Sequence, residues 1–560
     1  MTGVGAIPGR VAAKIRPPSD LPPRRSDLAA DAIAGVSVAV VLVPQAMAYA
    51  EMAGLPAWQG LLASGLPPLV SALWTSSPWL QSGPTAMSAL LTQGVLASMA
   101  LAAGADTRPE TVMGRAALLA LMIGAIRLTL GRLRLGVLAS LLSRSVLVGF
   151  SLAAALLIAA SQLPAVLDAD VAAGSTLARG VAVLLDPQRW RIDAVVISLT
   201  TLLILVVSPR IHRLLPGVLI AVGAGAVAAP LLGYQGATVA DGGGLDLYVI
   251  GVGIWTTLVA IPWGEVPLLL VPATTLALAG FAEAAAVAQR YAEIERVRWD
   301  PDRELLGQGA ANLVAGAIGS MPVGGSFARS AISHMAGART ALAGAIASCI
   351  VLCLMPIFGL LETLPRAVLA AIVLMASWSL FDLRPLLRLG RLSRSQSAIA
   401  LGTFGMTLAT APHVELGLLA GTAAAIAVHL WRELEVHVEV EARGDELWLR
   451  PQGVLWFGSA PRFRQRVADV LADPLNFGPP PTAARALVLD LGGLGKIDLS
   501  GALTLRELID SLQEGGVDVR VADVPLQLRD MLGRVTIATS AVGPEPGGAS
   551  PAPPDSPSPR

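Results

Sequence analysis

The chain has 560 residues, of which 54% are hydrophobic and only 14% are charged, whereas soluble domains carry about 25% charged residues. Its formal net charge is zero, so nucleic acid is not an expected partner. The apolar residues gather before position 431 in runs that approach the roughly 20 residues of a membrane-spanning helix. This composition excludes a soluble globular protein and predicts an integral protein of the lipid bilayer.

The first 26 residues predict a cytoplasmic segment, and residues 27–433 predict a polytopic α-helical transmembrane domain of 14 spans. The opening segment is polar and has no continuous apolar stretch, so a cleavable signal peptide is not expected. The expected spans are 28–49, 57–75, 84–102, 112–130, 136–162, 192–208, 214–232, 270–291, 304–320, 326–337, 340–360, 364–381, 397–411 and 414–431. The third and the tenth are short or interrupted, because they follow the breaks Ser82-Gly83-Pro84 and Pro322-Val323-Gly324-Gly325.

Arginine placement predicts the orientation, because cytoplasmic loops of membrane proteins are enriched in Lys and Arg. The clusters expected on one side are Arg24 and Arg25; Arg127, Arg132 and Arg134; Arg210 and Arg213; Arg290, Arg296, Arg298 and Arg303; and Arg384, Arg388, Arg391 and Arg394. An even number of spans then predicts that both termini are cytoplasmic. Arg179, Arg189 and Arg191 fall on the opposite side, in a longer loop where the rule is weak.

The two Gly/Pro breaks occupy matching places in the two halves of the transmembrane region. Gly83 lies in the third span of the first half, and Gly324 directly precedes the third span of the second half. Broken helices at corresponding positions are typical of transporters built from inverted repeats. We therefore predict a 7+7 inverted repeat.

After residue 434 the pattern changes to short strands that alternate with helices, which predicts a small cytosolic α/β domain over residues 434–542. The expected strands are His437–Val440, Glu446–Leu449, Ala486–Asp490 and Val517–Ala522, and the expected helix is Leu503–Leu512. Residues 543–560 are rich in Pro, Ser and Gly, a composition that predicts a disordered tail.

Three stretches resemble the signature regions of the SulP (sulfate permease, solute carrier 26) family of anion transporters. They read DAIAGVSVAVVLVPQAMAYAEMAGL at residues 31–55, QSGPTAMSAL at residues 81–90, and GSMPVGGSFARSAISHMAGA at residues 319–338. Their order, followed by a segment similar to a STAS domain, extends the resemblance over most of the chain. The resemblance implies a mobile core and a gate, an elevator-like mechanism, a homodimer, and no enzymatic activity or cofactor.

The same resemblance implies secondary active transport of a small anion across the inner (cytoplasmic) membrane. Sulfate, bicarbonate and a small dicarboxylate such as fumarate all remain open as substrates. Rival interpretations are a nucleobase-type carrier of the same architecture, an uncoupled anion channel, and a non-transporting membrane sensor that signals through its STAS domain. No GxxxxGK[ST] motif occurs, which argues against an ATP-driven pump.

The two breaks are the expected place of anion binding. A helix that begins inside the membrane leaves its first N–H groups unpaired, and its dipole places about half a positive charge there. Two such ends would attract an anion without a lone Arg or Lys in lipid, which costs roughly 2.5–3.5 kcal/mol or more. The alternative is that the breaks only kink their helices. The residues expected to bind the anion at the helix starts are Thr85, Ala86, Gly325, Ser326, Phe327 and Ala328.

Three further polar residues complete the expected substrate site. Arg329 either attracts the anion from behind the second helix start or pairs with a carboxylate such as Glu283. Gln45 and Tyr49 are four residues apart, so they share one helix face, and the resemblance places that face beside the anion. Alternatively, each of the two bonds to a neighbouring helix.

Glu283 is the expected site of proton coupling. It lies in an apolar segment, where an ionised carboxylate is costly and protonation is favoured unless a partner compensates. Protonation would also remove a like charge that opposes anion binding. In the family that the chain resembles, sodium-coupled relatives have Asp at this position and Thr one turn later, whereas this chain has Glu283 and Val287. Loss of that hydroxyl ligand favours protons over sodium, and a permanent pair with Arg329 is the alternative.

The remaining chemistry-bearing residues favour structural roles. Cys349 and Cys353 lie one turn apart in an apolar run, a spacing that suits neither a disulfide framework nor a metal site and favours packing. Asp498 and Ser500 resemble the phosphorylated turn of anti-sigma-factor antagonists, but both residue types are also ordinary helix caps.

Overall fold

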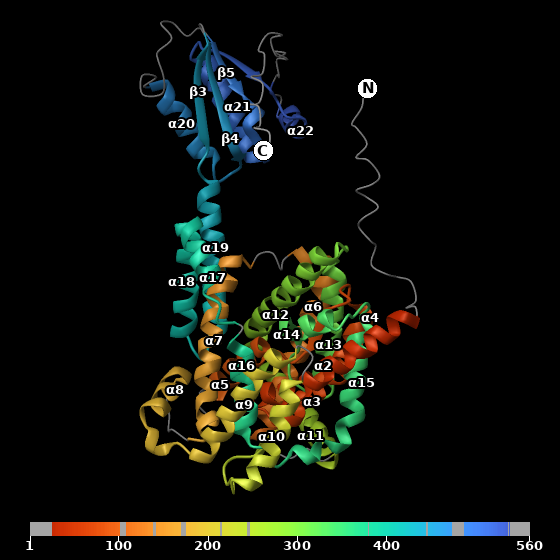
Figure 1. The fold of residues 1–560 in the computed structure, drawn as a ribbon. Helices are drawn as coiled ribbons and strands as arrows, with labels where there is room; N and C mark the ends of the chain where they lie inside the picture. The colour runs from red at the N-terminus through yellow and green to blue at the C-terminus, as the bar shows by residue number, and fades with distance from the viewer. Residues whose placement is uncertain are drawn as a thin grey trace, which may run out of the picture. The chain divides into compact units, whose positions relative to one another are not determined.

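The computed structural model describes residues 25–100, 108–137, 142–169, 175–212, 216–242, 247–378, 380–443, 446–472, 486–535 and 537. The predictions for the first 24 residues, for Arg213 and for the tail 543–560 lie outside this described part. The chain divides into two compact units, Met1–Ala425 and Ile426–Arg560. Figure 1 shows the elements of both, and each unit is described by itself.

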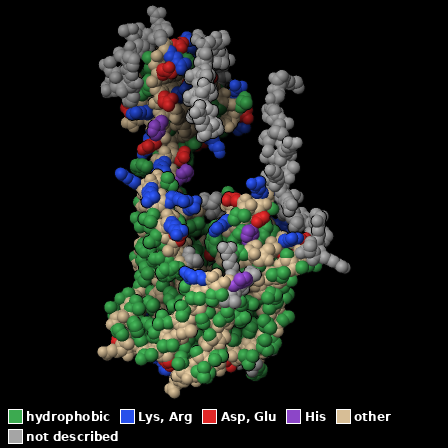
Figure 2. Space-filling view, viewed as in Figure 1, with side chains coloured by type: hydrophobic (Ala, Val, Ile, Leu, Met, Phe, Trp, Pro, Cys, Tyr) green, Lys and Arg blue, Asp and Glu red, His purple; other side chains and the backbone are tan. Residues whose placement is uncertain are grey.

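The first unit is a helical assembly with two short strands. Among the described residues, seven helices are long and apolar enough to cross a membrane. Hydrophobic side chains cover most of the face of this unit seen in Figure 2, and charged side chains gather mainly at one end. Its elements are α2 (Arg25–Met52), α3 (Ala57–Ser64), α4 (Leu66–Trp74), β1 (Gln81–Gly83), α5 (Ala86–Ala100), α6 (Pro109–Arg132), α7 (Arg144–Leu167), α8 (Thr176–Leu185), α9 (Ile192–Ile211), α10 (Gly217–Leu231), α11 (Leu247–Val259), α12 (Val266–Glu295), α13 (Pro301–Ala317), β2 (Gly324–Ser326), α14 (Phe327–Met335), α15 (Leu342–Leu354), α16 (Arg366–Trp378), α17 (Arg384–Leu392), α18 (Arg394–Ala409) and, up to Ala425, α19 (Val414–Glu433).

Most predicted spans coincide with one helix, but three differences are informative. The span predicted at 57–75 is divided into α3 and α4 at Gly65. The span predicted at 136–162 begins late, at Arg144, because Ser143 caps that helix through its hydroxyl. Helix α11 was not predicted, since Gly251 and Gly253 weaken its helical pattern. Helices α8 and α17 were not predicted either, and the number of 14 spans stays a prediction.

Helices α6 and α13 pack closely because a glycine of each helix lies against the backbone of the other. A Cβ atom on Gly124 would lie 2.6 Å from the Leu313 nitrogen, and one on Gly309 would lie 2.8 Å from the Leu128 nitrogen. Small residues allow this approach in membrane proteins, where van der Waals packing takes over from the hydrophobic effect. Helix α13 also packs on α4.

The helix contacts separate two bundles within the first unit. The core bundle comprises α2–α6 and α11–α15, in which α6 contacts α11, α12 and α13, and α2 contacts α3, α14 and α15. The gate bundle comprises α7–α10 and α16–α18, in which α7 contacts α8, α16 and α18. The bundles meet where α2 contacts α10 and α16. A salt bridge of 3.4 Å between Glu51 and Arg366 joins them there.

The second unit is an α/β domain, as predicted. Its strands are β3 (His437–Arg443), β4 (Glu446–Leu455), β5 (Ala486–Asp490), β6 (Leu494–Ile497) and β7 (Asp518–Ala522), and its helices are α20 (Ala460–Ala472), α21 (Leu499–Glu514) and α22 (Leu526–Arg534). The sheet order is β3-β4-β5-β7, with β6 paired to β4. The β3–β4 pair is antiparallel, and the other pairs are parallel.

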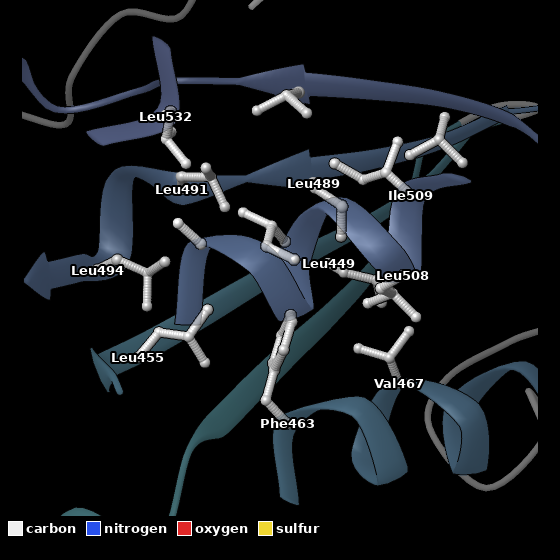
Figure 3. Packing of buried hydrophobic residues seen from close by; sticks show 14 of the residues in the cluster. Leu449, Leu455, Phe463, Val467, Leu489, Leu491, Leu494, Leu508, Ile509 and Leu532 are labelled. Carbon is white, nitrogen blue, oxygen red and sulfur yellow. The ribbon is translucent and has the colours of Figure 1, made fainter. Parts of the chain in front are cut away.

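Leucine-rich packing holds the helices to this sheet. In Figure 3, Phe463 and Val467 of α20 and Leu508 of α21 point toward Leu449 and Leu489 of the strands. A polar contact borders this core, because Arg450 Nε donates to Asp490 Oδ2 at 2.7 Å. That ion pair raises the pKa of Arg450.

Candidate functional site

The two Gly/Pro breaks meet in the structure. Strands β1 and β2 pair antiparallel, with Gln81 opposite Ser326 and Gly83 opposite Gly324. Helix α5 begins at Ala86, after Pro84 and Thr85 have followed β1, and helix α14 begins at Phe327, directly after β2. The prediction that the third and tenth spans are broken helices is therefore confirmed, and the alternative of a simple kink is wrong.

Each of the two helix starts has a side-chain cap. Thr85 Oγ1 accepts from the Ser88 nitrogen at 3.1 Å, and the Thr85 nitrogen donates to Ser88 Oγ at 3.0 Å. Ser326 Oγ accepts from the Arg329 nitrogen at 3.4 Å. The amides directly after the capping residues have no intrahelical acceptor. Phe327 and Ala328 are exposed and Ala86 is partly exposed, so these helix starts are accessible.

Glycine allows the paired strands β1 and β2, which we call the crossing, to fit between their neighbours. Gly83 has φ +140°, a backbone conformation that favours glycine. A Cβ atom on Gly325 would lie 2.8 Å from Ala284 Cβ and 2.8 Å from Leu80 Cδ1. Strand β2 therefore lies directly against α12 because Gly325 has no side chain.

Arg329 is fully buried in the first turn of α14. Its Nη1 donates to the Pro84 carbonyl oxygen at 2.8 Å, which ties α14 to the chain just before α5. Its Nε and Nη2 are buried and have no hydrogen-bond acceptor within the described part of the chain. A buried charge without acceptors is costly, so this guanidinium is suited to an anionic ligand.

Glu283 lies in the middle of α12 and is partly exposed. Its charge interacts with those of Arg329 and Arg127. No salt bridge or hydrogen bond joins Glu283 to Arg329 in the part that the structure describes. The carboxyl group therefore interacts electrostatically with both cations but makes no direct contact with Arg329.

Gln45 and Tyr49 are buried on α2, which packs against α14. Tyr49 lies close enough to Arg329 and Glu283 for their charges to interact with its hydroxyl. Gln45 Oε1 has no hydrogen-bond partner among the described residues. The structure thus brings Tyr49, Arg329 and Glu283 together. Gln45, on α2 with Tyr49, has a polar atom without a partner in the described residues.

Arg127 was expected in the loop after the fourth span, and the structure corrects this. It lies inside α6, and only 2% of its surface is exposed. Its Nε donates to the Ala277 oxygen at 3.0 Å, its Nη2 to the Leu276 oxygen at 3.3 Å, and its Nη1 to the Val323 oxygen at 3.2 Å. Its position within the apolar run 112–130, before the exposed pair Arg132 and Arg134, was the available signal.

Polar residues of α13 support the same crossing from behind. Asn312 Oδ1 accepts from the Val323 nitrogen at 3.0 Å, and its Nδ2 donates to the Val323 oxygen at 2.9 Å. Gln308 Nε2 donates to Ser82 Oγ at 2.7 Å. Neither residue was singled out in the sequence, because an amide side chain shows its partner only when the fold brings the two together.

A small cavity lies between the crossing and α6. Its lining is Thr85, Ser88, Leu91, Ile123, Arg127, Leu276, Gly280, Pro322, Val323 and Gly324. Of the residues expected to bind the anion, Thr85 faces this cavity. A Cβ atom on Gly280 would lie 2.5 Å from Arg127 Nη2, so this glycine makes room for the guanidinium against α12.

The remaining candidates have structural surroundings. Cys349 and Cys353 are free thiols that are exposed on α15, so they do not pack in the interior of the first unit as expected. Asp498 caps α21 by accepting from the Gly501 nitrogen at 2.6 Å, which confirms its expected capping role. Ser500 is exposed in the first turn of that helix.

Comparison with known proteins shows which family and which fold the chain resembles. Residues 28–403 match the model of the sulfate permease family, and residues 437–540 match that of the STAS domain. A probable sulfate transporter of Mycobacterium tuberculosis is 30% identical over 533 residues, which are 91% of each chain. The inward-facing structure of the murine Slc26a9 anion transporter superposes with a TM-score of 0.80 at 19% identity, covering 95% of this chain and 92% of that one. The transmembrane domain of the cyanobacterial bicarbonate transporter BicA gives 0.61 at 22% identity, covering 72% and 98%.

Proposed function

This chain belongs to the sulfate permease family and ends in a STAS domain, and on that basis we propose that it is a secondary active transporter of a small anion. Sulfate is the first candidate, because the Mycobacterium tuberculosis relative is named a probable sulfate transporter. Bicarbonate and small dicarboxylates such as fumarate are the other candidates, because backbone amides recognise negative charge more than detailed shape.

One observation carries the proposal: two helix starts meet beside a buried guanidinium that has unused donors. The starts of α5 and α14 each present unpaired N–H groups and about half a positive charge. Arg329 adds two donor atoms without acceptors. Together these groups would replace the hydration shell of an anion inside the membrane. In this proposal the anion contacts the amides near Thr85, Ala86, Gly325, Ser326, Phe327 and Ala328, with Gln45, Tyr49 and Arg329 beside it.

Glu283 is the proposed proton carrier. Its carboxyl group lies near two cations and is partly exposed, so a proton can reach it. An ionised Glu283 repels the anion, whereas a protonated one does not. Anion binding and protonation therefore favour each other, which is the physical basis of symport.

Movement of the core bundle against the gate bundle is the proposed transport step. Contacts between the bundles lie mainly where α2 meets α10 and α16, with smaller ones where α7 meets α2 and α5, and each bundle packs more extensively within itself, which supports relative motion of the two. We also propose that the chain forms a homodimer in the inner (cytoplasmic) membrane with both termini in the cytoplasm. Because Arg127 is buried, it no longer counts among the arginines that predict the cytoplasmic side of the membrane. Arg132 and Arg134, at the end of α6, still do.

The proposed domain limits are residues 27–433 for transport and 434–542 for the STAS domain, which would regulate or assist assembly without carrying substrate. The match of the STAS model over residues 437–540 supports the second limit.

The test is uptake by the full-length chain in proteoliposomes across a panel of radiolabelled anions, with and without a pH gradient. We expect accumulation of at least one of sulfate, bicarbonate and fumarate that is driven by an inward proton gradient. Excess uracil should not compete, as it would for a nucleobase carrier. Large anion currents without proton movement would favour a channel, and no uptake of any anion would contradict the proposal.

A further inference from the structure

The charge of Arg127 is not cancelled by its hydrogen-bond partners. Its Nε, Nη1 and Nη2 all donate to neutral carbonyl oxygens, on α12 and just before β2. The ionised group that interacts with its charge is Glu283. Arg127 therefore holds the crossing in place and also brings a full positive charge to it.

Three charged groups that interact with one another at the crossing leave a net positive charge among themselves. Arg127 and Arg329 are cations, Glu283 is their shared carboxylate, and Tyr49 is a neutral phenol that faces Arg329 and Glu283. With Glu283 ionised, the two cations and one carboxylate sum to one positive charge. With Glu283 protonated, the sum is two positive charges.

We propose that Arg127 determines the valence of the transported anion and decides whether a proton accompanies it. This inference rests on the proposed function. Moving a net charge through a low-dielectric interior is costly, so the loaded site should move most readily when Arg127, Arg329, Glu283 and the anion together carry no net charge. A divalent anion meets this condition when Glu283 is protonated, and a monovalent anion meets it when Glu283 is ionised.

Without the charge of Arg127 the balance shifts by one unit. Arg329 and Glu283 would then cancel, so a monovalent anion would require protonation of Glu283. A divalent anion would leave one negative charge even with Glu283 protonated. Arg127 is therefore expected to allow sulfate transport with one proton and monovalent transport with none.

Arg127 lies near the proposed position of the anion, so its charge can act on the anion without direct contact. The guanidinium lines the same cavity as Thr85, Ser88 and Gly324, which belong to the two helix starts. Gly280 brings it against α12, one turn before Glu283. Arg127 is thus a specificity-determining and positioning residue, because it acts through charge and not by touching the substrate.

The experiment compares the full-length wild type with Arg127→Met and Arg127→Lys in proteoliposomes at clamped membrane potential. Uptake of radiolabelled sulfate and chloride is measured at several external pH values, together with proton movement. The wild type should move protons with sulfate and none with chloride. Arg127→Met should lower the sulfate-to-chloride uptake ratio at least about tenfold and make chloride uptake rise as the external pH falls. Arg127→Lys should keep the wild-type pattern.

A charge-balanced change on the same helix is the matched control. Arg115 of α6 is buried and pairs with the partly exposed Glu265 at 2.8 Å, so Arg115→Gln with Glu265→Gln removes both charges without changing the net charge. That double variant should keep the wild-type ratio.

A wild-type ratio and pH-independent chloride uptake in Arg127→Met would overturn the inference. If Arg127→Met does not fold, the other measurements decide. Wild-type sulfate uptake without protons, or Arg127→Lys that has lost the sulfate preference, would overturn it equally. Failure of the wild type to take up sulfate or chloride while it transports bicarbonate or fumarate would also overturn the inference, whereas uptake of no anion at all would contradict the proposed function.

Discussion

Arg329 and Glu283 present opposite charges to one another from α14 and α12, without a direct contact in the described structure. This separation matters chemically, because a carboxylate locked in a bidentate pair could not easily exchange its proton. The residue scale therefore holds the most direct tests of coupling and of anion binding.

Glu283→Gln should abolish accumulation driven by a pH gradient and leave anion exchange partly intact. The amide cannot ionise, so it mimics the protonated side chain permanently. Uptake and counterflow of labelled sulfate in proteoliposomes measure the two activities separately. If accumulation driven by the pH gradient persists unchanged, Glu283 is not the proton carrier.

Gly325→Ala should lower anion uptake by about 10–100-fold, the effect of a displacement near 1 Å in a binding site. Its methyl group would meet Ala284 and Leu80 at 2.8 Å, which pushes β2 away from α12. Gly402→Ala on α18 is the matched control, because no atom lies within 4 Å of its added Cβ. Equal uptake by both variants would mean that the close fit of β2 does not matter.

At the scale of elements, the site depends on short segments that cannot hold their own position. Strands β1 and β2 have three residues each, too few to be stable without support. Asn312, Gln308 and Arg127 supply that support from α13 and α6. Close packing of α6 on α13 through Gly124 and Gly309 keeps these supporting side chains in register with the strands.

Asn312→Ala should therefore destabilise the core bundle and reduce transport. It leaves the buried Val323 N–H without its acceptor, a loss that costs about 1–3 kcal/mol. The midpoint temperature of thermal unfolding in detergent and the rate of anion uptake should both decrease. The control is Thr410→Ala at the C-terminal cap of α18, whose hydroxyl donates to the Met406 oxygen of the same helix; it should change neither. Wild-type stability in Asn312→Ala would contradict the supporting role.

At the scale of the whole molecule, the site lies within the first unit, and the second unit has its own sheet and hydrophobic core. Each unit therefore has the packing needed for a separate role. Transport and regulation can be tested by removing one unit and measuring the other's activity.

Removal of residues 434–560 should leave anion transport measurable in proteoliposomes, with altered expression or regulation. The residues that would bind the anion and carry the proton all precede this segment. The full-length chain with Ser500→Ala is the matched control for signalling through the exposed serine. Complete loss of uptake on removal, in a protein that remains folded, would contradict the proposal that the first unit transports the anion by itself.

The two helix breaks were predicted from the sequence because their signal is local. Gly83-Pro84 and Gly324-Gly325 interrupt apolar runs, so the two broken helices and their starts were predictable from backbone chemistry alone. Strand Ala486–Asp490 was predicted with its observed limits because a short apolar run between turns has few other interpretations. Helix α11 was missed because its glycines reduce local propensity, and packing on α6 compensates for that loss.

The sequence by itself determined the membrane class, the two-part organisation, the family resemblance and the helix breaks, because each depends on composition or on neighbours along the chain. Only the tertiary structure decided that the breaks pair with one another, that Arg329 retains two donors without acceptors, and that Arg127 is buried against α12 and Val323. These facts join residues about 150 to 250 positions apart. Side-chain type alone does not specify such contacts, since the partner of a guanidinium is set by where the fold places carbonyl oxygens and carboxylates.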